Sequence, residues 1–129
     1  MKFTKKINLA TCLAVIDKDN CIMLTRRVAN MKYFPKAWVI PGGHVDKGER
    51  IESGVVREIL EETGIKIDKQ QTKSGLKYYF NDQEVNLEPF FAFESGSHAG
   101  SFAPPTSGHL ILFYKVKLPV SWTEIDIKL

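Results

Sequence analysis

The chain has 129 residues, of which 43% are hydrophobic, and a net charge of +3 from 18 basic and 15 acidic residues. This length and apolar content suit one small globular domain with one core, so we expect residues 1–129 to form a single domain. The small charge excess fits an anionic small-molecule partner and does not by itself indicate nucleic-acid binding. No stretch approaches the about 20 apolar residues that cross a bilayer, so no membrane partner is expected.

The two cysteines are not expected to form a disulfide. Residues 17–20, Asp-Lys-Asp-Asn, predict a turn. A hairpin centred there pairs Ile16 with Cys21 and places Cys12 opposite Thr25, so the thiols do not face each other. Two unpaired thiols favour a reducing compartment, and we expect the cytoplasm.

The two ends of the chain carry weak similarities to targeting signals. The basic, then apolar, N-terminus is interrupted by Asn8 and Thr11, so a first strand is favoured over a signal peptide. The last three residues, Ile-Lys-Leu, resemble a peroxisomal ending but have a bulky side chain where a small one is expected.

Apolar runs separated by turn residues predict a strand-rich chain. The first run is apolar on both faces, which is typical of a strand in the centre of a sheet. Residues 95–108 are a long Gly/Ser/Pro loop, and loops of this length are often functional. Residues 122–129 predict a short turn of helix or an edge strand. We expect strands over residues 7–16, 21–28, 38–40, 65–67, 77–80, 89–94 and 110–118, with loops over 29–37, 68–74 and 81–88.

One amphipathic helix is predicted over residues 50–63. Gly64 follows the last periodic residue and suits a left-handed helix stop. Glu49 lies in or just before the first turn, where a carboxylate favours the positive helix end. Apolar side chains recur at every fourth position, at Ile51, Val55, Ile59 and Thr63.

The same helix gathers acid on one face. Glu58 lies three residues before Glu61 and four before Glu62, so the three carboxylates crowd together. Like charges at this spacing destabilise a helix, so an offsetting cation is indicated, and oxygen ligands select hard ions such as Mg²⁺ or Mn²⁺. The alternative is a solvated acidic face. Gly42 and Gly43, just upstream, let the backbone approach a ligand closely, or serve only as turn residues.

The stretch from Gly43 to Ile65 resembles the Nudix box, Gly-x5-Glu-x7-Arg-Glu-U-x-Glu-Glu-x-Gly-U with U aliphatic. The resemblance implies an α/β fold, an α/β/α sandwich around a mixed sheet, and a metal-dependent hydrolase of diphosphates linked to another moiety. Its usual second helix, near the C-terminus, is short or missing here. The box is matched at Gly43, Glu49, Arg57, Glu58, Ile59, Glu61, Glu62, Gly64 and Ile65.

The resemblance also implies roles for these residues. The carbonyl of Gly43 and the glutamates 58, 61 and 62 would bind the metal, with Glu61 as a further ligand or base. Arg57 would pair with Glu49 and orient the glutamates, although it could instead face the substrate. A general base often lies outside the box, where Glu94 and His98 are candidates. The predicted catalytic residues are Glu49, Arg57, Glu58, Glu61 and Glu62.

Phosphate contacts are predicted around the glycine loop. Arg26 and Arg27 end the second predicted strand, and alternation points them to opposite faces, so at most one faces the cleft. His44 could touch phosphate. Lys32 and Lys36 either add contacts or belong to a solvated basic rim, while Trp38 is expected in the core. The predicted substrate-binding residues are Arg26, Arg27, Gly42, His44 and Glu94.

The similarity extends over roughly residues 9–118. MLTRR at 23–27 and WVIPGGHVD at 38–46 are similar to a pattern of the animal Nudix motif-17-type hydrolases, which implies capped RNA as one substrate. Capped nucleotides, coenzyme A esters and nucleoside diphosphate sugars all stay open. The alternative is a non-catalytic nucleotide-binding module of the same fold. The missing helix indicates either a truncated chain or a sheet face covered by a partner subunit, as in a homodimer.

Overall fold

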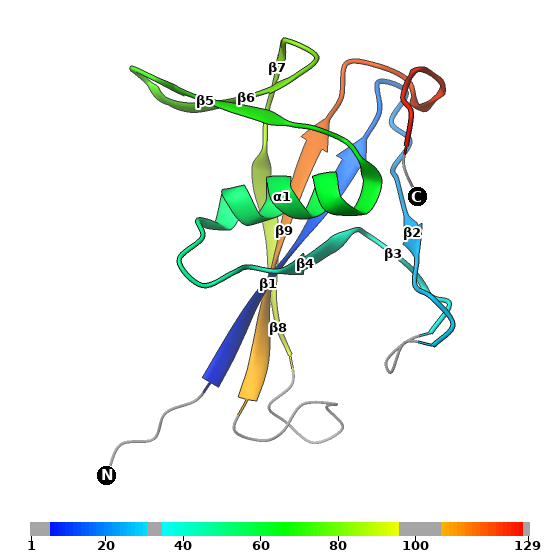
Figure 1. Cartoon of the computed structure of the whole chain (residues 1–129), viewed down its shortest axis with the longest axis vertical. Coiled ribbons are helices and arrows are strands. Elements are labelled where there is room, and N and C mark those ends of the chain that lie inside the picture. Colours follow the sequence, from blue (N-terminus) through cyan, green and yellow to red (C-terminus); the bar gives the residue numbers. More distant parts are fainter. Residues whose placement is uncertain (1–5, 31–34, 96–106, 128–129) are drawn as a thin grey trace.

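The computed structural model describes residues 6–30, 35–95 and 107–127. One α-helix, nine strands and one 3-10 turn lie within these ranges (Figure 1). They are, in chain order, β1 Lys6–Ile16, β2 Thr25–Arg26, β3 Trp38–Val39, β4 Gly42–His44, α1 Ile51–Thr63, β5 Asp68–Thr72, β6 Gly75–Phe80, β7 Gln83–Val85, β8 Glu88–Ser95, β9 Ser107–Lys117 and the 3-10 turn η1 Trp122–Glu124.

The main sheet is mixed, as predicted, with strand order β4-β1-β9-β8. The two central strands run parallel and stay in register from Lys6 opposite Ser107 to Ile16 opposite Lys117. The edge strands β4 and β8 pair antiparallel with them. Two small sheets, β2-β3 and β5-β6-β7, lie outside this one.

The predicted helix is confirmed as α1, and Arg50 is its N-cap residue. Gly64 ends it with φ 80°, and its N–H donates to the carbonyl of Leu60 at 2.9 Å. This conformation strains most side chains but not glycine. The apolar stripe faces the sheet, because Val55 and Ile59 are each only 1% exposed.

The core lies between α1 and one face of the main sheet. Figure 1 shows α1 lying across the central strands. Leu13 and Val15 of β1, together with Val116 of β9, are at most 2% exposed and pack in one cluster with the helix. Each such burial contributes about 1.5–3 kcal/mol relative to exposure. This packing fixes α1 on the sheet.

The opposite face of the sheet carries exposed aromatic side chains. Directly paired residues share a face, so Phe91 lies beside Phe113 and Phe93 beside Ile111. Phe91 is 57% exposed and Phe93 50% exposed. Within the described ranges the only helical element after β9 is the three-residue turn η1, so the predicted short or missing C-terminal helix is confirmed.

Asp17 ties the C-terminal turn to the end of β1. Its Oδ2 accepts the N–H of Trp122 at 3.1 Å, and its Oδ1 accepts the N–H groups of Asp19 and Cys21, each at 2.9 Å. Burial alone would raise the pKa of Asp17, but the three backbone donors outweigh it and lower the pKa. The carboxylate thus stays ionised while only 2% of the residue is exposed.

Several predicted strands differ from the observed ones. Residues 65–67 are not a strand, since they pair with no other strand, and their two isoleucines join the core at 2% and 3% exposure instead. The predicted loops 68–74 and 81–88 instead contain β5 and β7, whose polar residues pair with β6. Of the second predicted strand, residues 21–28, only Thr25–Arg26 form a strand, β2. The two loop predictions rested on the polarity of their residues. They are wrong because hairpin pairing at a surface tolerates polar side chains.

The predicted hairpin register after β1 is off by one. Ile16 pairs with Ile22 rather than with Cys21, and Thr25 pairs with Val39 rather than with Cys12. Both cysteines are free.

Trp38 was predicted to be core and is 63% exposed, so that prediction is wrong. It belongs to the small β2-β3 sheet, where Arg26 pairs with it and covers its ring, with 5.7 Å from the guanidinium carbon to the ring centroid. A cation–π contact replaces burial here.

Candidate active site

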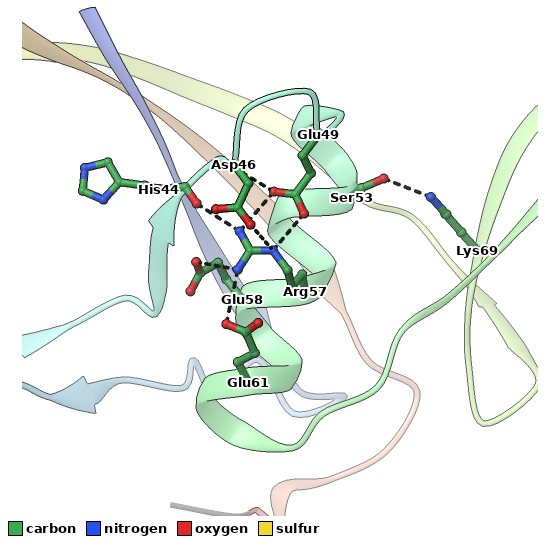
Figure 2. Close-up of polar contacts among 8 residues, drawn as sticks. All are labelled: His44, Asp46, Glu49, Ser53, Arg57, Glu58, Glu61 and Lys69. Atoms are coloured by element: carbon green, nitrogen blue, oxygen red, sulfur yellow. Dashed lines mark hydrogen bonds and ion pairs between the residues drawn. The ribbon is translucent and has the colours of Figure 1, made fainter.

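Arg57 joins the glycine loop to the acidic helix. Its Nε donates to Glu49 Oε2 at 2.8 Å and its Nη2 to Glu49 Oε1 at 3.0 Å, a bidentate pair (Figure 2). Its Nη1 donates to Glu58 at 3.0 Å and to Glu61 at 3.2 Å. Its Nη2 also donates to the backbone carbonyl of His44 at 3.0 Å. The predicted pairing of Arg57 with Glu49 is confirmed, and one guanidinium holds two segments together.

Glu49 is fixed from both sides. Its Oε1 accepts a hydrogen bond from the N–H of Asp46 at 3.0 Å. In turn, the N–H of Glu49 donates to the carbonyl of Asp46, also at 3.0 Å. The hydrogen bonds from Arg57, then the one from Asp46, lower the pKa of Glu49. The pKa of Arg57 is raised for the same reason, chiefly through Glu49. The carboxylate of Glu49 is therefore held in its charged form at neutral pH and anchors Arg57.

Two residues of this network, Asp46 and Gly54, were not predicted from the sequence. Asp46 lies 3.5 Å from Arg57 Nε through its Oδ2. Gly54 is buried, and a Cβ there would lie 3.0 Å from Glu49 Oε1. A glycine in the middle of a helix is unfavourable by about 1 kcal/mol relative to alanine. Its presence in the predicted helix was therefore a sequence signal that Gly54 has a special role.

Gly43 brings the backbone of β4 against the helix. A Cβ on this residue would lie 2.5 Å from the carboxyl carbon of Glu58, so the missing side chain is what lets the carboxylate approach. A Cβ on Gly42 would instead lie 2.1 Å from the backbone oxygen of Thr11 on β1. The first glycine thus shapes the strand pairing and the second shapes the site.

Glu62 completes the acidic cluster. Its partial burial raises its pKa, and the neighbouring charges of Glu58 and Glu61 add to this, against the lowering effect of the N–H of Gly42. The same cluster reaches Cys12 on β1, whose pKa is raised by burial and by Glu62. The carboxylates therefore repel one another at neutral pH, and a cation would relieve that repulsion.

These donors fit a hard divalent ion. All are oxygens, and Arg57 engages Glu58 through Oε1 and Glu61 through Oε2, one oxygen of each carboxylate. Among the described residues, no three His, Cys, Asp or Glu side chains are already arranged around a metal position. The donor chemistry suits Mg²⁺ or Mn²⁺, with Arg57 presently holding two of the three glutamates.

The predicted phosphate-binding arginines lie on β2 and beside it. Arg26 is exposed and its Nε donates to the carbonyl of Lys36 at 3.0 Å. Arg27 is partly buried, and its N–H donates to the carbonyl of Ala37 at 2.8 Å. The two residues differ in exposure, in line with the predicted alternation.

His44 and Glu94 lie on opposite sides of the sheet. Figure 2 shows the His44 ring pointing away from Arg57, and it contacts the ring of His109. Glu94 pairs with Leu110, which places it on the same face as Leu112 and α1. Lys32 and His98 fall outside the described residues, whereas Lys36 is described and is exposed.

A glycine loop and an acidic helix, joined by one arginine and carried on a mixed sheet, define the class of domain. The chain belongs to the NUDIX domain family, whose profile matches residues 6–116. The members of this family that are hydrolases generally use divalent metal ions.

Two curated relatives illustrate the range of the family. The chain is 32% identical over 73 residues to the m7GpppN-mRNA hydrolase NUDT17 of Danio rerio, covering 57% of this chain and 24% of that relative. It is 49% identical over 51 residues to the ADP-ribose pyrophosphatase of Methanocaldococcus jannaschii, covering 40% of this chain and 29% of the relative. The similarity thus spans about a quarter of each relative's length.

The solved structures show the same fold. The MutT protein from Methanosarcina mazei superposes with a TM-score of 0.60 at 19% identity, over 99% of this chain and 72% of that one. At this identity the likeness concerns the fold alone. It agrees with the α/β class that the sequence predicted.

Proposed function

We propose that this domain hydrolyses a diphosphate linkage in a nucleoside diphosphate joined to another moiety, using Mg²⁺ or Mn²⁺. The observation that carries the proposal is the acidic cluster on α1, held against Gly43 by Arg57. Glu58, Glu61 and Glu62 lie within two turns of α1, and Arg57 ties the first two of them to Glu49, which favours a rigid set of oxygen ligands.

The carbonyl of Gly43 and the side chains of Glu58, Glu61 and Glu62 would hold the metal. When bound, such an ion neutralises phosphate charge and lowers the pKa of a coordinated water. Glu62 is partly buried and accepts a hydrogen bond from the N–H of Gly42, which restrains the position of this carboxylate.

Arg57 acts as a positioning residue. Its guanidinium is shared among Glu49, Glu58 and Glu61, so it sets the distance between the helix and the loop. Glu49 anchors it and needs no contact with substrate. Arg26, Arg27, Gly42 and His44 stay proposals for the substrate-binding set, as does Glu94 for the general base. Glu94 is supported by its position on the α1 face of the sheet.

Capped nucleotides are the substrate class to test first. The supporting observation is the relative from Danio rerio, whose name specifies an m7GpppN-mRNA hydrolase. The archaeal relative is named an ADP-ribose pyrophosphatase, which keeps sugar-linked diphosphates in the panel. Coenzyme A esters complete it.

The test is product analysis on this panel with Mg²⁺ and with Mn²⁺. We compare the wild type with Glu62→Gln and with Glu84→Gln, which changes an exposed carboxylate on β7. Glu62→Gln should lower the rate by about 10²–10³-fold, the range for removing one preorganised electrostatic group, and Glu84→Gln should not. Binding of a nucleotide without cleavage by folded wild type would instead support a non-catalytic binding module.

We further propose that the chain acts as one domain in the cytoplasm and pairs with a second copy. Two free thiols support a reducing compartment. The exposed Phe91 and Phe93 support a homodimer, since contiguous apolar surface favours association. The structure contains no helix, in the described residues, that is long and apolar enough to span a membrane. Sedimentation of wild type against Phe91→Ser tests the dimer, which the substitution should weaken.

A further inference from the structure

Two histidine rings meet on the sheet face opposite the acidic helix. His44 on β4 pairs with Ala10 of β1. His109 on β9 pairs with Asn8, which also belongs to β1. The two partners on β1 are two residues apart, so both side chains point to one face. The ring centroids are 5.6 Å apart, with the ring planes tilted by 54°.

This separation fits one metal ion bound by both rings. A zinc–nitrogen bond of about 2.0–2.1 Å places the ion about 3.2 Å from each ring centroid, and a tetrahedral angle then separates the centroids by about 5.2 Å. The observed separation is 5.6 Å.

The surroundings are accessible to an ion. His44 is exposed and His109 is partly buried. Ala10, which lies between the two strands, carries only a methyl group. Imidazole is a ligand for zinc, copper and nickel, whereas Mg²⁺ prefers oxygen, so this pair and the glutamates select different metals.

We propose that His44 and His109 bind a transition-metal ion of the zinc, copper and nickel class, with water completing its coordination. No third His, Cys, Asp or Glu side chain joins them in the part of the chain that the structure describes, so the site is open. The backbone carbonyl of His44 accepts the hydrogen bond from Arg57 at 3.0 Å. An ion bound by the imidazole therefore restrains the same residue of β4 that Arg57 holds from the other side.

The test uses the untagged full chain, titrated with Zn²⁺ by calorimetry in excess Mg²⁺, which occupies the carboxylates. Cu²⁺ titration followed by electron paramagnetic resonance reports nitrogen ligands independently. The variants are His44→Gln and His109→Gln, and His98→Gln serves as the control that removes the third histidine of the chain. The two site variants keep a polar side chain of similar size, and their melting temperatures show that they fold.

We expect one ion per chain in the wild type and in His98→Gln. Loss of an outer-shell partner alone weakens metal binding roughly tenfold, so loss of either ligand should weaken it by at least that factor. The nitrogen signature of Cu²⁺ should change in both site variants. Binding that survives in both of them, or that disappears instead with Glu62→Gln, would overturn the proposal.

Discussion

The two faces of the central sheet differ although the same strands build both. On the α1 face Leu13 and Val15 are at most 2% exposed, and the glutamate cluster is anchored there. On the far face Phe91 and Phe93 are at least half exposed. Because successive side chains of a strand point to opposite faces of the sheet, neighbouring residues face either the packed helix or the exposed far surface. The proposed chemistry lies on the face where a packed helix holds side chains still, since precise donor geometry needs a rigid support.

Breaking the arginine link on the α1 face should have the largest effect. Arg57→Ala leaves Glu49, Glu58 and Glu61 without their shared cation, so we expect the hydrolysis rate to fall about 10²-fold or more. Mn²⁺ affinity should fall with it, because the carboxylates lose their orientation. Arg57→Lys keeps the charge but not the bidentate geometry and should be intermediate. Steady-state kinetics with Mn²⁺ titration measures both, and wild-type rates in Arg57→Ala would contradict the positioning role.

A matched pair of truncations compares the faces directly. Leu13→Ala opens a cavity under α1 and should lower the free energy of unfolding by about 2–5 kcal/mol. Phe93→Ala removes a larger side chain from the far face but should cost about 1 kcal/mol or less in the monomer. Urea denaturation at low protein concentration measures both. Equal losses would mean that the far face is also packed in solution.

The two neighbouring glycines of β4 also face different surroundings. Gly42→Ala forces a Cβ into the backbone of Thr11 and should destabilise the fold by about 1–3 kcal/mol or more. Gly43→Ala meets only the end of the Glu58 side chain, which can move aside. We therefore expect it to lose activity with little loss of stability. Thermal denaturation beside kinetics separates the two, and a reversed order would refute the assignment of their roles.

The smallest expected effect is a stability gain in Glu62→Gln without metal. The pKa of Glu62 is raised, so its ionisation opposes folding. This penalty is complete above the folded-state pKa and disappears as the pH falls through the unfolded-state value. Gln keeps an acceptor for the N–H of Gly42 but carries no charge. Melting temperatures should thus favour the variant at neutral pH and converge in acid, and a gain that persists in acid would point to another cause.

Adding Mn²⁺ should reverse the order of these melting temperatures. An ion bound to the three glutamates stabilises the wild type in proportion to its occupancy. The variant lacks one ligand and should respond less. Equal shifts would argue against Glu62 as a ligand.

The acidic helix was predictable because its signals are local. Its apolar spacing, its glycine stop and the spacing of its glutamates each lie within one or two turns, and the structure places α1 at Ile51–Thr63. The Arg57–Glu49 pair came from the resemblance and is confirmed. The polar strands β5 and β7 were missed because their pairing with β6 is visible only in three dimensions.

The family, the helix with its oxygen ligands and the mixed α/β class could all be predicted from the sequence, because short-range periodicity and a dense motif encode them. Three contacts could be found only in three dimensions: Trp38 stacks on Arg26, Asp46 and Gly54 support Glu49, and the ring of His44 lies beside that of His109. These contacts join residues from different elements. Their geometry depends on the strand order β4-β1-β9-β8, which no local pattern of the chain records.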